Sequence, residues 1–173
     1  MNLNFSEEKC EEKCEDNIRL DVLEYYNTDS CIITGLCENL YTFPIIPLHN
    51  DKLLSQISYK DKLNDVRNFL PLNKYVYKAM SELCICLIYE GKTEYNKHEF
   101  FIWSGWHDMW SNKLFWLEKI IKQNYKRKYI YFEEHNKPFR AFLKLHAQQC
   151  LHKAILYEQK RENDVIDRKS TRL

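Results

Sequence analysis

The sequence predicts an all-α fold, a single bundle of four to six helices with a tryptophan-rich central helix. Apolar residues recur every three or four positions along most of the chain, which is the spacing of a helix that buries one face. Only 3 Gly and 4 Pro occur among 173 residues, too few for the many tight turns of a β-sandwich or barrel. Aromatic residues make up 14% of the chain. Each buried ring removes about 150–250 Å² from water, so the core is expected to be sizeable.

We divide the chain into an acidic, cysteine-containing N-terminal arm over residues 1–16, a helical domain over 17–160 and a charged C-terminal tail over 161–173. The arm repeats Glu-Glu-Lys-Cys, which places Cys10 and Cys14 one helical turn apart. The favoured interpretation is a polar tail with incidental thiols. A metal clip or a thiol-linked partner is the alternative.

The helical domain begins with a modest amphipathic helix that carries Ile18, Val22 and Tyr26 and ends in the turn-forming residues 27–30. Residues 31–50 are expected to be loop-like, because two prolines in this segment remove backbone donors.

From residue 51 the apolar spacing becomes helical again, and Pro71 is expected to be the first residue of a new helix. That helix is predicted to close at Gly91, because glycine is favoured just after a helix end. Cys84 and Cys86 would lie on different faces of it. They are therefore interpreted as buried thiols rather than as a metal-binding motif.

The most distinctive segment is residues 100–121, which contains all 4 Trp. It is predicted to form the central helix, with an apolar stripe wide enough to be packed by neighbours on more than one side. Most of this stripe is expected to be core. Trp103 and Trp106, beside Gly105, are the candidates for an exposed binding groove.

A basic cluster with interleaved tyrosines follows the tryptophan-rich segment, and its cations are Lys122, Lys126, Arg127 and Lys128. Cations in a last helical turn offset the helix dipole, so a solvated helix end is the favoured interpretation. Phosphate contacts, with bases stacked on the tyrosines, are the alternative. The net charge of +1 argues against nucleic-acid binding by the chain as a whole.

A final amphipathic helix is predicted from Phe139 to about Lys160, and it places His146 and Cys150 one turn apart. Zinc requires three or four converging ligands, and no second paired motif supplies them, so neither a metal nor a cofactor is expected. The sequence contains no nucleophile elbow, phosphate-binding loop or dinucleotide fingerprint. We therefore expect a protein that is not an enzyme.

The 7 Cys form no regular framework, which is typical of reduced thiols in an intracellular protein. No secretory signal is visible at the start, and the longest apolar runs are far shorter than the ~20 residues of a membrane span. A soluble, cytoplasmic protein is the expectation. The ending Thr171-Arg172-Leu173 has the Thr-x-Leu pattern that PDZ domains capture, which makes it a candidate ligand for such a domain.

Phe101-Ile102-Trp103, followed by His107 and Lys113, resembles the aromatic-Trp…His…Lys pattern of the PRESAN (PHIST) helical domain of malaria-parasite exported proteins. The similarity covers at most residues 94–160, and Lys52-x-Leu54-x-Gln56 only approximates the export motif of that family. The resemblance implies an all-helical module that binds host cytoskeletal or membrane-associated proteins without catalysis. It also implies export into a host cell as the alternative localisation.

The leading functional hypothesis is a non-catalytic helical protein–protein interaction module, and its more specific form is a host- or cytoskeleton-binding adaptor. Its partner would be another protein. The alternative is a nucleic-acid-associated factor that uses the basic and aromatic cluster at residues 122–131.

Overall fold

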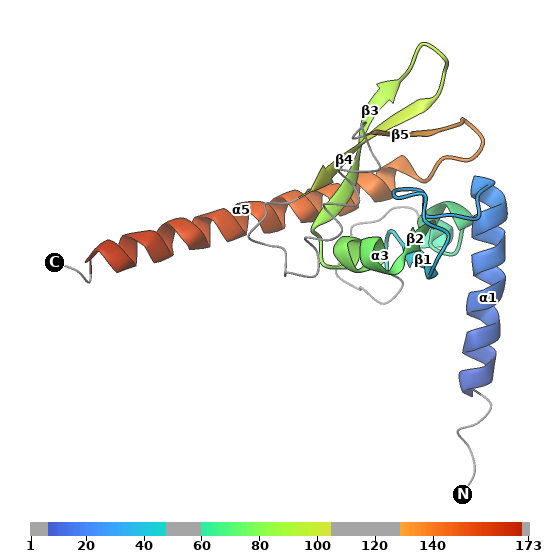
Figure 1. Cartoon of the computed structure of the whole chain (residues 1–173), viewed down its shortest axis with the longest axis horizontal. Helices are drawn as coiled ribbons and strands as arrows, with labels where there is room; N and C mark the ends of the chain where they lie inside the picture. Colours follow the sequence, from blue (N-terminus) through green and yellow to red (C-terminus); the bar gives the residue numbers. More distant parts are fainter. Residues whose placement is uncertain (1–6, 48–59, 105–128, 171–173) are drawn as a thin grey trace, which may run out of the picture.

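The computed structural model describes residues 7–47, 60–104 and 129–170. Across these ranges the chain forms three α-helices and five β-strands, and the strands make two antiparallel sheets (Figure 1). The all-α bundle predicted from the sequence is therefore wrong, and the fold is mixed α/β. In chain order the elements are α1 (Glu7–Tyr26), β1 (Leu40–Pro44), 3₁₀ turns at Lys60–Lys62 and Val66–Asn68, β2 (Phe69–Asn73), α3 (Lys74–Ser81), β3 (Ile85–Lys92), β4 (His98–Ser104), β5 (Tyr129–Phe132) and α5 (Arg140–Ser170).

Helix α1 ends at the turn predicted from the sequence, but it begins at Glu7, inside the segment assigned to the N-terminal arm. Asn27 has a φ of 48°, and the N–H of Thr28 donates to the carbonyl of Leu23 at 3.1 Å, which closes the last turn. Asparagine adopts this left-handed conformation more readily than most residues. The end of α1 is thus set by local sequence.

The two-stranded sheet pairs β1 with β2. Pro71 lies inside β2 opposite Thr42, and its carbonyl accepts from the N–H of Ile32 at 3.1 Å. The prediction that Pro71 begins a helix is wrong, because an edge strand also tolerates a residue without a backbone donor. Strand β1 likewise falls in the segment predicted to be loop.

Helix α3 begins after Asn73, whose side-chain Oδ1 accepts from the N–H of Val76 at 3.0 Å and so caps the helix. It has only 8 residues, and the chain leaves it through Leu83, at a φ of 57°, before entering β3. The long helix predicted from Pro71 to Gly91 is therefore wrong. Gly91 lies at a bulge in the β3–β4 ladder with a φ of 143°, a conformation that glycine adopts at low cost.

The three-stranded sheet has the order β3-β4-β5, so β3 and β5 are its edge strands. Along β4, His98, Phe100 and Ile102 are buried, whereas Phe101 and Trp103 are half-buried. The start of the predicted tryptophan-rich helix is thus a strand. Because apolar side chains occupy both faces of β4, the sequence shows an apolar run instead of the period of two. The rest of that predicted helix, residues 105–121, lies outside the described residues.

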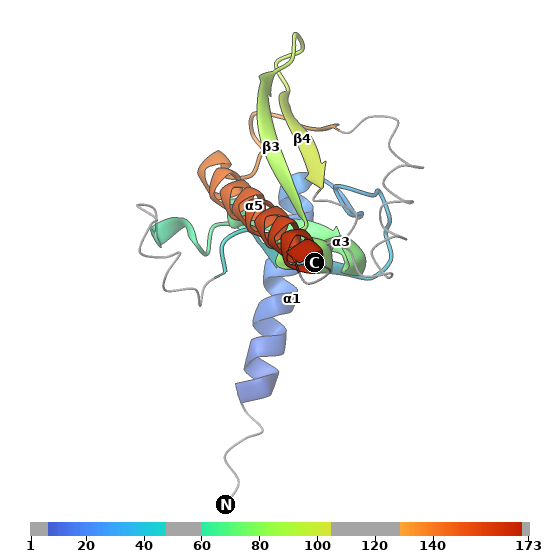
Figure 2. The same cartoon turned by 90° about the vertical axis from the view of Figure 1, so that its left-hand side faces the viewer.

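The main core forms where α1, α3, both sheets and the start of α5 meet. Its completely buried residues include Val22, Leu70, Val76, Phe100 and Ile85. Figures 1 and 2 show α1 and α5 leaving this centre in different directions, with α5 extending well past the strands. Helix α5 agrees with the last predicted helix and continues to Ser170. None of the helices within the described ranges has both the length and the apolar character needed to cross a membrane.

Candidate binding groove between β3 and α5

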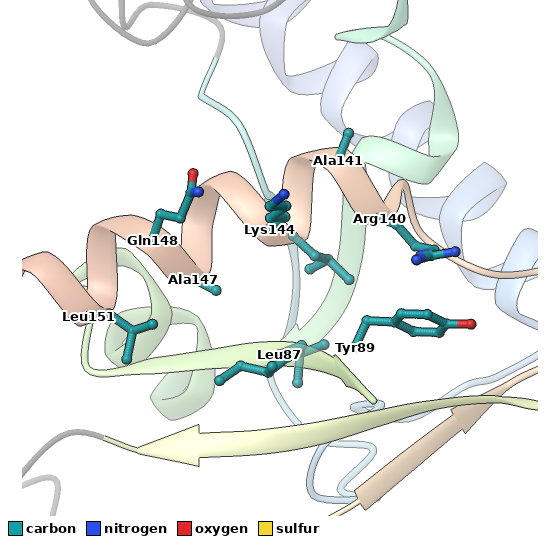
Figure 3. Close-up of a pocket in the computed structure, with 10 residues that line it drawn as sticks. Leu87, Tyr89, Arg140, Ala141, Lys144, Ala147, Gln148 and Leu151 are labelled. Atoms are coloured by element: carbon teal, nitrogen blue, oxygen red, sulfur yellow. The ribbon is translucent and has the colours of Figure 1, made fainter. Parts of the chain in front are cut away.

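A groove of about 560 Å³ lies between strand β3 and the first half of helix α5 (Figure 3). Buried apolar side chains form its floor, namely Leu87, Leu143 and Ala147. Its rim on α5 is exposed and changes from cationic side chains at the start of the helix to apolar ones further along. The groove therefore has a charged end and an apolar end.

The rim is a single line of side chains along α5. Its members follow one another at three- and four-residue intervals, which places them on one face of the helix: Arg140, Lys144, Gln148, Leu151 and Ile155. Leu151 is 40% exposed and Ile155 is 53% exposed. The apolar lining of the groove thus continues along α5 as an exposed apolar strip.

Among the described residues, the cations at the charged end have no acidic partner. The guanidinium of Arg140 lies over the ring of Tyr89, 3.7 Å from its centroid. Neither Arg140 nor Lys144 makes an ion pair or hydrogen bond within the part of the chain that the structure describes. No acidic side chain is among the described residues that line the groove, so none of them compensates the positive charge at this end.

Tyr89 connects the groove to a buried histidine on β4. Its hydroxyl lies 3.2 Å from Nδ1 of His98, which is only 2% exposed, and Nε2 of His98 lies 2.6 Å from Oε2 of Glu134. With its proton on Nε2, His98 donates to Glu134 and accepts from the tyrosine hydroxyl. Glu134 also pairs with Lys92 at 2.9 Å and with Lys137.

These partners hold the pKa of Glu134 far below its ordinary value of 4.5. The bond from Lys137 is the largest cause, followed by those from His98 and Lys92. Glu134 therefore stays ionised at neutral pH and ties the segment after β5 to strands β3 and β4. Its charge is already engaged, so it does not neutralise Arg140.

We expect Glu134→Gln to lower the melting temperature at pH 7. A carboxyl group whose pKa is lower in the folded chain than in the unfolded chain stabilises the fold above its unfolded pKa, and this stabilisation is lost as the pH falls. The difference from the wild-type protein should therefore shrink steadily below pH 4.5, the ordinary pKa. Thermal unfolding at pH 7, 4 and 3 measures it.

Glu133→Gln is the matched control for this prediction, because Glu133 pairs with the single exposed Lys97 at 3.0 Å. An exposed pair of this kind contributes about 0–1 kcal/mol, so the control should unfold nearly as the wild-type protein does. A Glu134→Gln deficit that is equally large at pH 7 and pH 3 would contradict the assigned ion pairs.

A pair of buried thiols lies beside the groove. Cys86 and Cys150 pack with Ala147, and Trp103 partly covers them. Contact with the Cys86 thiol, together with burial, raises the pKa of Cys150 far above its ordinary value, so this thiol stays protonated and unreactive. The interpretation of Cys86 as a small apolar residue agrees with its complete burial.

His146 and Cys150 do share a face of α5, with Nδ1 3.8 Å from Sγ. His146 Nε2 lies 3.1 Å from the carbonyl oxygen of Met80, and both side chains are buried. Within the described ranges, no group of three or more His, Cys, Asp or Glu side chains is placed to hold a metal ion. The two residues therefore pack as part of the interior.

Trp103 is the one proposed site residue that the structure describes, and it is half-buried on β4. The other proposed residues lie outside the described ranges: Trp106, Lys122, Lys126, Arg127, Lys128 and the ending Thr171-Arg172-Leu173. Sequence reasoning missed Arg140, Lys144 and Leu151 as site residues. Their spacing along the last helix was the available signal, but the strand that faces them was not predicted.

No protein-family model, curated protein or solved structure matches this chain. The geometry and the charges of the groove are therefore the features that indicate a function.

Proposed function

We propose that this chain is a non-catalytic protein–protein interaction module whose partner docks along α5. The observation that carries the proposal is the exposed apolar strip formed by Leu151 and Ile155, which continues the lining of the groove. Exposed apolar surface that is contiguous and bordered by polar residues is typical of an interaction site. Single exposed apolar residues elsewhere on the surface need no such explanation.

The histidine next to the groove supports a binding role. Both ring nitrogens of His98 are engaged, one by the hydroxyl of Tyr89 and one by Glu134. A general base needs a ring nitrogen within hydrogen-bond reach of the proton it removes. The arrangement therefore fits a structural histidine that holds Tyr89 in place beneath Arg140.

The test is capture of partners from the native lysate with two variants of the full chain. We expect Leu151→Glu/Ile155→Glu to lose the captured protein, because a charged side chain in a buried apolar interface must be desolvated. Leu156→Glu is the matched control. Leu156 is 51% exposed, but it lies about a third of a turn away from the strip, so this variant should keep the partner.

Two outcomes would contradict the proposal. One is a wild-type chain that captures no protein above background, and the other is capture that survives Leu151→Glu/Ile155→Glu. Nuclease treatment of the lysate distinguishes protein binding from the alternative function, nucleic-acid binding. A nucleic-acid-associated factor acting through residues 122–131 would lose its captured material on digestion.

A further inference from the structure

We infer that the occupant of the groove is an amphipathic helix of the partner, which places acidic side chains beside Arg140 and Lys144 and apolar side chains against Leu151 and Ile155. This inference rests on the proposed function and specifies the chemistry of the partner.

The charge of the groove indicates that its partner is acidic at one end. The charged end of the groove presents two cations, and no acidic side chain lines it among the described residues. The guanidinium of Arg140 lies over the face of an aromatic ring and makes no ion pair or hydrogen bond to a described residue, so no described carboxylate occupies its N–H groups. Guanidinium and carboxylate form paired, charge-assisted hydrogen bonds. The nearby carboxylate of Glu134 is already held by Lys92, Lys137 and His98.

The packing of α5 indicates a helical rather than an extended occupant. Cys86 and Leu87 are consecutive in β3 and therefore point to opposite faces of the sheet. Helix α5 packs on both of them. Its Leu143 belongs to the same core as Leu87, and its Ala147 and Cys150 pack on Cys86. Helix α5 thus covers the edge of β3, which an added strand would need for its backbone hydrogen bonds.

The spacing of the rim matches a second helix. Its side chains recur every three or four residues from Arg140 to Ile155, so they form a ridge of the kind that packs into the groove of a neighbouring helix. At 1.5 Å per residue this ridge is about 22 Å long, which corresponds to roughly 15 residues of partner helix. The order of the rim also gives the partner a direction, with its acidic end at the start of α5.

The exposure of the rim favours a peptide over a fatty acid. A small-molecule site usually encloses about 70–90% of its ligand. Here Arg140, Lys144 and Leu151 are all exposed, and the apolar strip continues past the groove to Ile155. An elongated, open surface of this kind is suited to one face of a helix.

A selection from a displayed library of random peptides tests the inference with the full chain as bait. We expect the enriched peptides to carry Asp or Glu within one helical turn of at least two large apolar residues. Synthetic peptides of the enriched sequence should bind Arg140→Glu/Lys144→Glu at least about tenfold more weakly than the wild-type protein. Peptides with Lys in place of the acidic residues should reverse that preference.

Lys160→Glu serves as the matched control, because it makes the same charge change per residue on the opposite side of α5. It should change the affinity by no more than about twofold. Circular dichroism of each variant shows whether α5 and the sheets remain folded. Because Arg140 and Lys144 are exposed, their charge reversal should leave the spectrum unchanged.

Three results would overturn the inference: no enrichment over the library background, a basic or uncharged consensus, or equal binding to wild-type protein and Arg140→Glu/Lys144→Glu. Dodecanoate, a fatty-acid anion, is added as a competitor to test whether the groove binds a lipid. If it binds through Arg140 and Lys144 while no peptide is enriched, the groove takes an anionic amphiphile instead. If capture from the lysate still depends on Leu151 and Ile155, the proposed function stands although the helical partner is excluded. If capture does not depend on them, both the proposed function and this inference are wrong.

Discussion

Replacement of Phe100 by alanine is expected to lower the free energy of unfolding by about 3–5 kcal/mol. Phe100 has no exposed surface, and its ring lies 5.2 Å from that of Tyr89 and 5.4 Å from that of Phe132. Removal of the ring leaves a cavity at the centre of the three-stranded sheet. Domains of ordinary stability unfold at about 5–15 kcal/mol, so the loss would be a large fraction of the total.

Urea unfolding followed by circular dichroism measures this loss. Phe101→Ala is the control, because Phe101 is the next residue of β4 on its opposite, half-buried face and should lose clearly less. Equal losses for the two variants would contradict the assigned faces of β4. Since Tyr89 packs on Phe100 and lines the groove, the Phe100 variant should also weaken peptide binding.

Replacement of Asn68 by leucine is expected to cost roughly 3 kcal/mol or more, because it leaves three buried backbone groups without partners, at about 1–3 kcal/mol each. Asn68 is completely buried. Its Oδ1 accepts from the N–H of Ile46 at 3.0 Å, and its Nδ2 donates to the carbonyls of Ile46 at 3.1 Å and Leu63 at 2.8 Å. One side chain thus joins the segments before β2 and after β1.

Asn136→Leu is the control for this second variant, because among the described residues the Oδ1 of half-buried Asn136 accepts a single bond, from the N–H of Glu133 at 3.0 Å. It should cost about 1 kcal/mol, the net contribution of one ordinary hydrogen bond. Denaturant midpoints with unchanged slopes would report stability alone. If Asn68→Leu costs no more than Asn136→Leu, the bonds of Asn68 do not hold the two segments together.

The helices that the sequence located correctly are stabilised by local interactions. Helix α1 ends at Tyr26, where the N–H groups of Asn27 and Thr28 bond to carbonyls only a few positions earlier. Helix α5 begins just after Pro138, within one residue of its predicted start. Each helical N–H pairs four residues back, so a short window of sequence contains most of what decides a helix. Apolar spacing therefore sufficed for these two elements.

The strands were missed because their partners are distant in the sequence and their burial hides the usual period. Ile85, Cys86 and Leu87 are all buried, since the core covers one face of β3 and α5 covers its edge. Such a strand reads as a continuous apolar run, which resembles a segment of buried helix. Tertiary packing decides which strands pair, as in the pairs Phe43 with Leu70 and Phe100 with Ile130.

The sequence by itself determined where the first helix ends, where the last helix begins and that the Cys86 thiol is buried. It also contained the spacing of the line of side chains from Arg140 to Ile155, which was not recognised as a site. Only the tertiary structure decided that this line faces β3 and that Tyr89 lies under Arg140. The reason is physical: a helix needs only hydrogen bonds between near neighbours. A groove needs two elements remote in sequence to pack side by side, and that depends on the whole core.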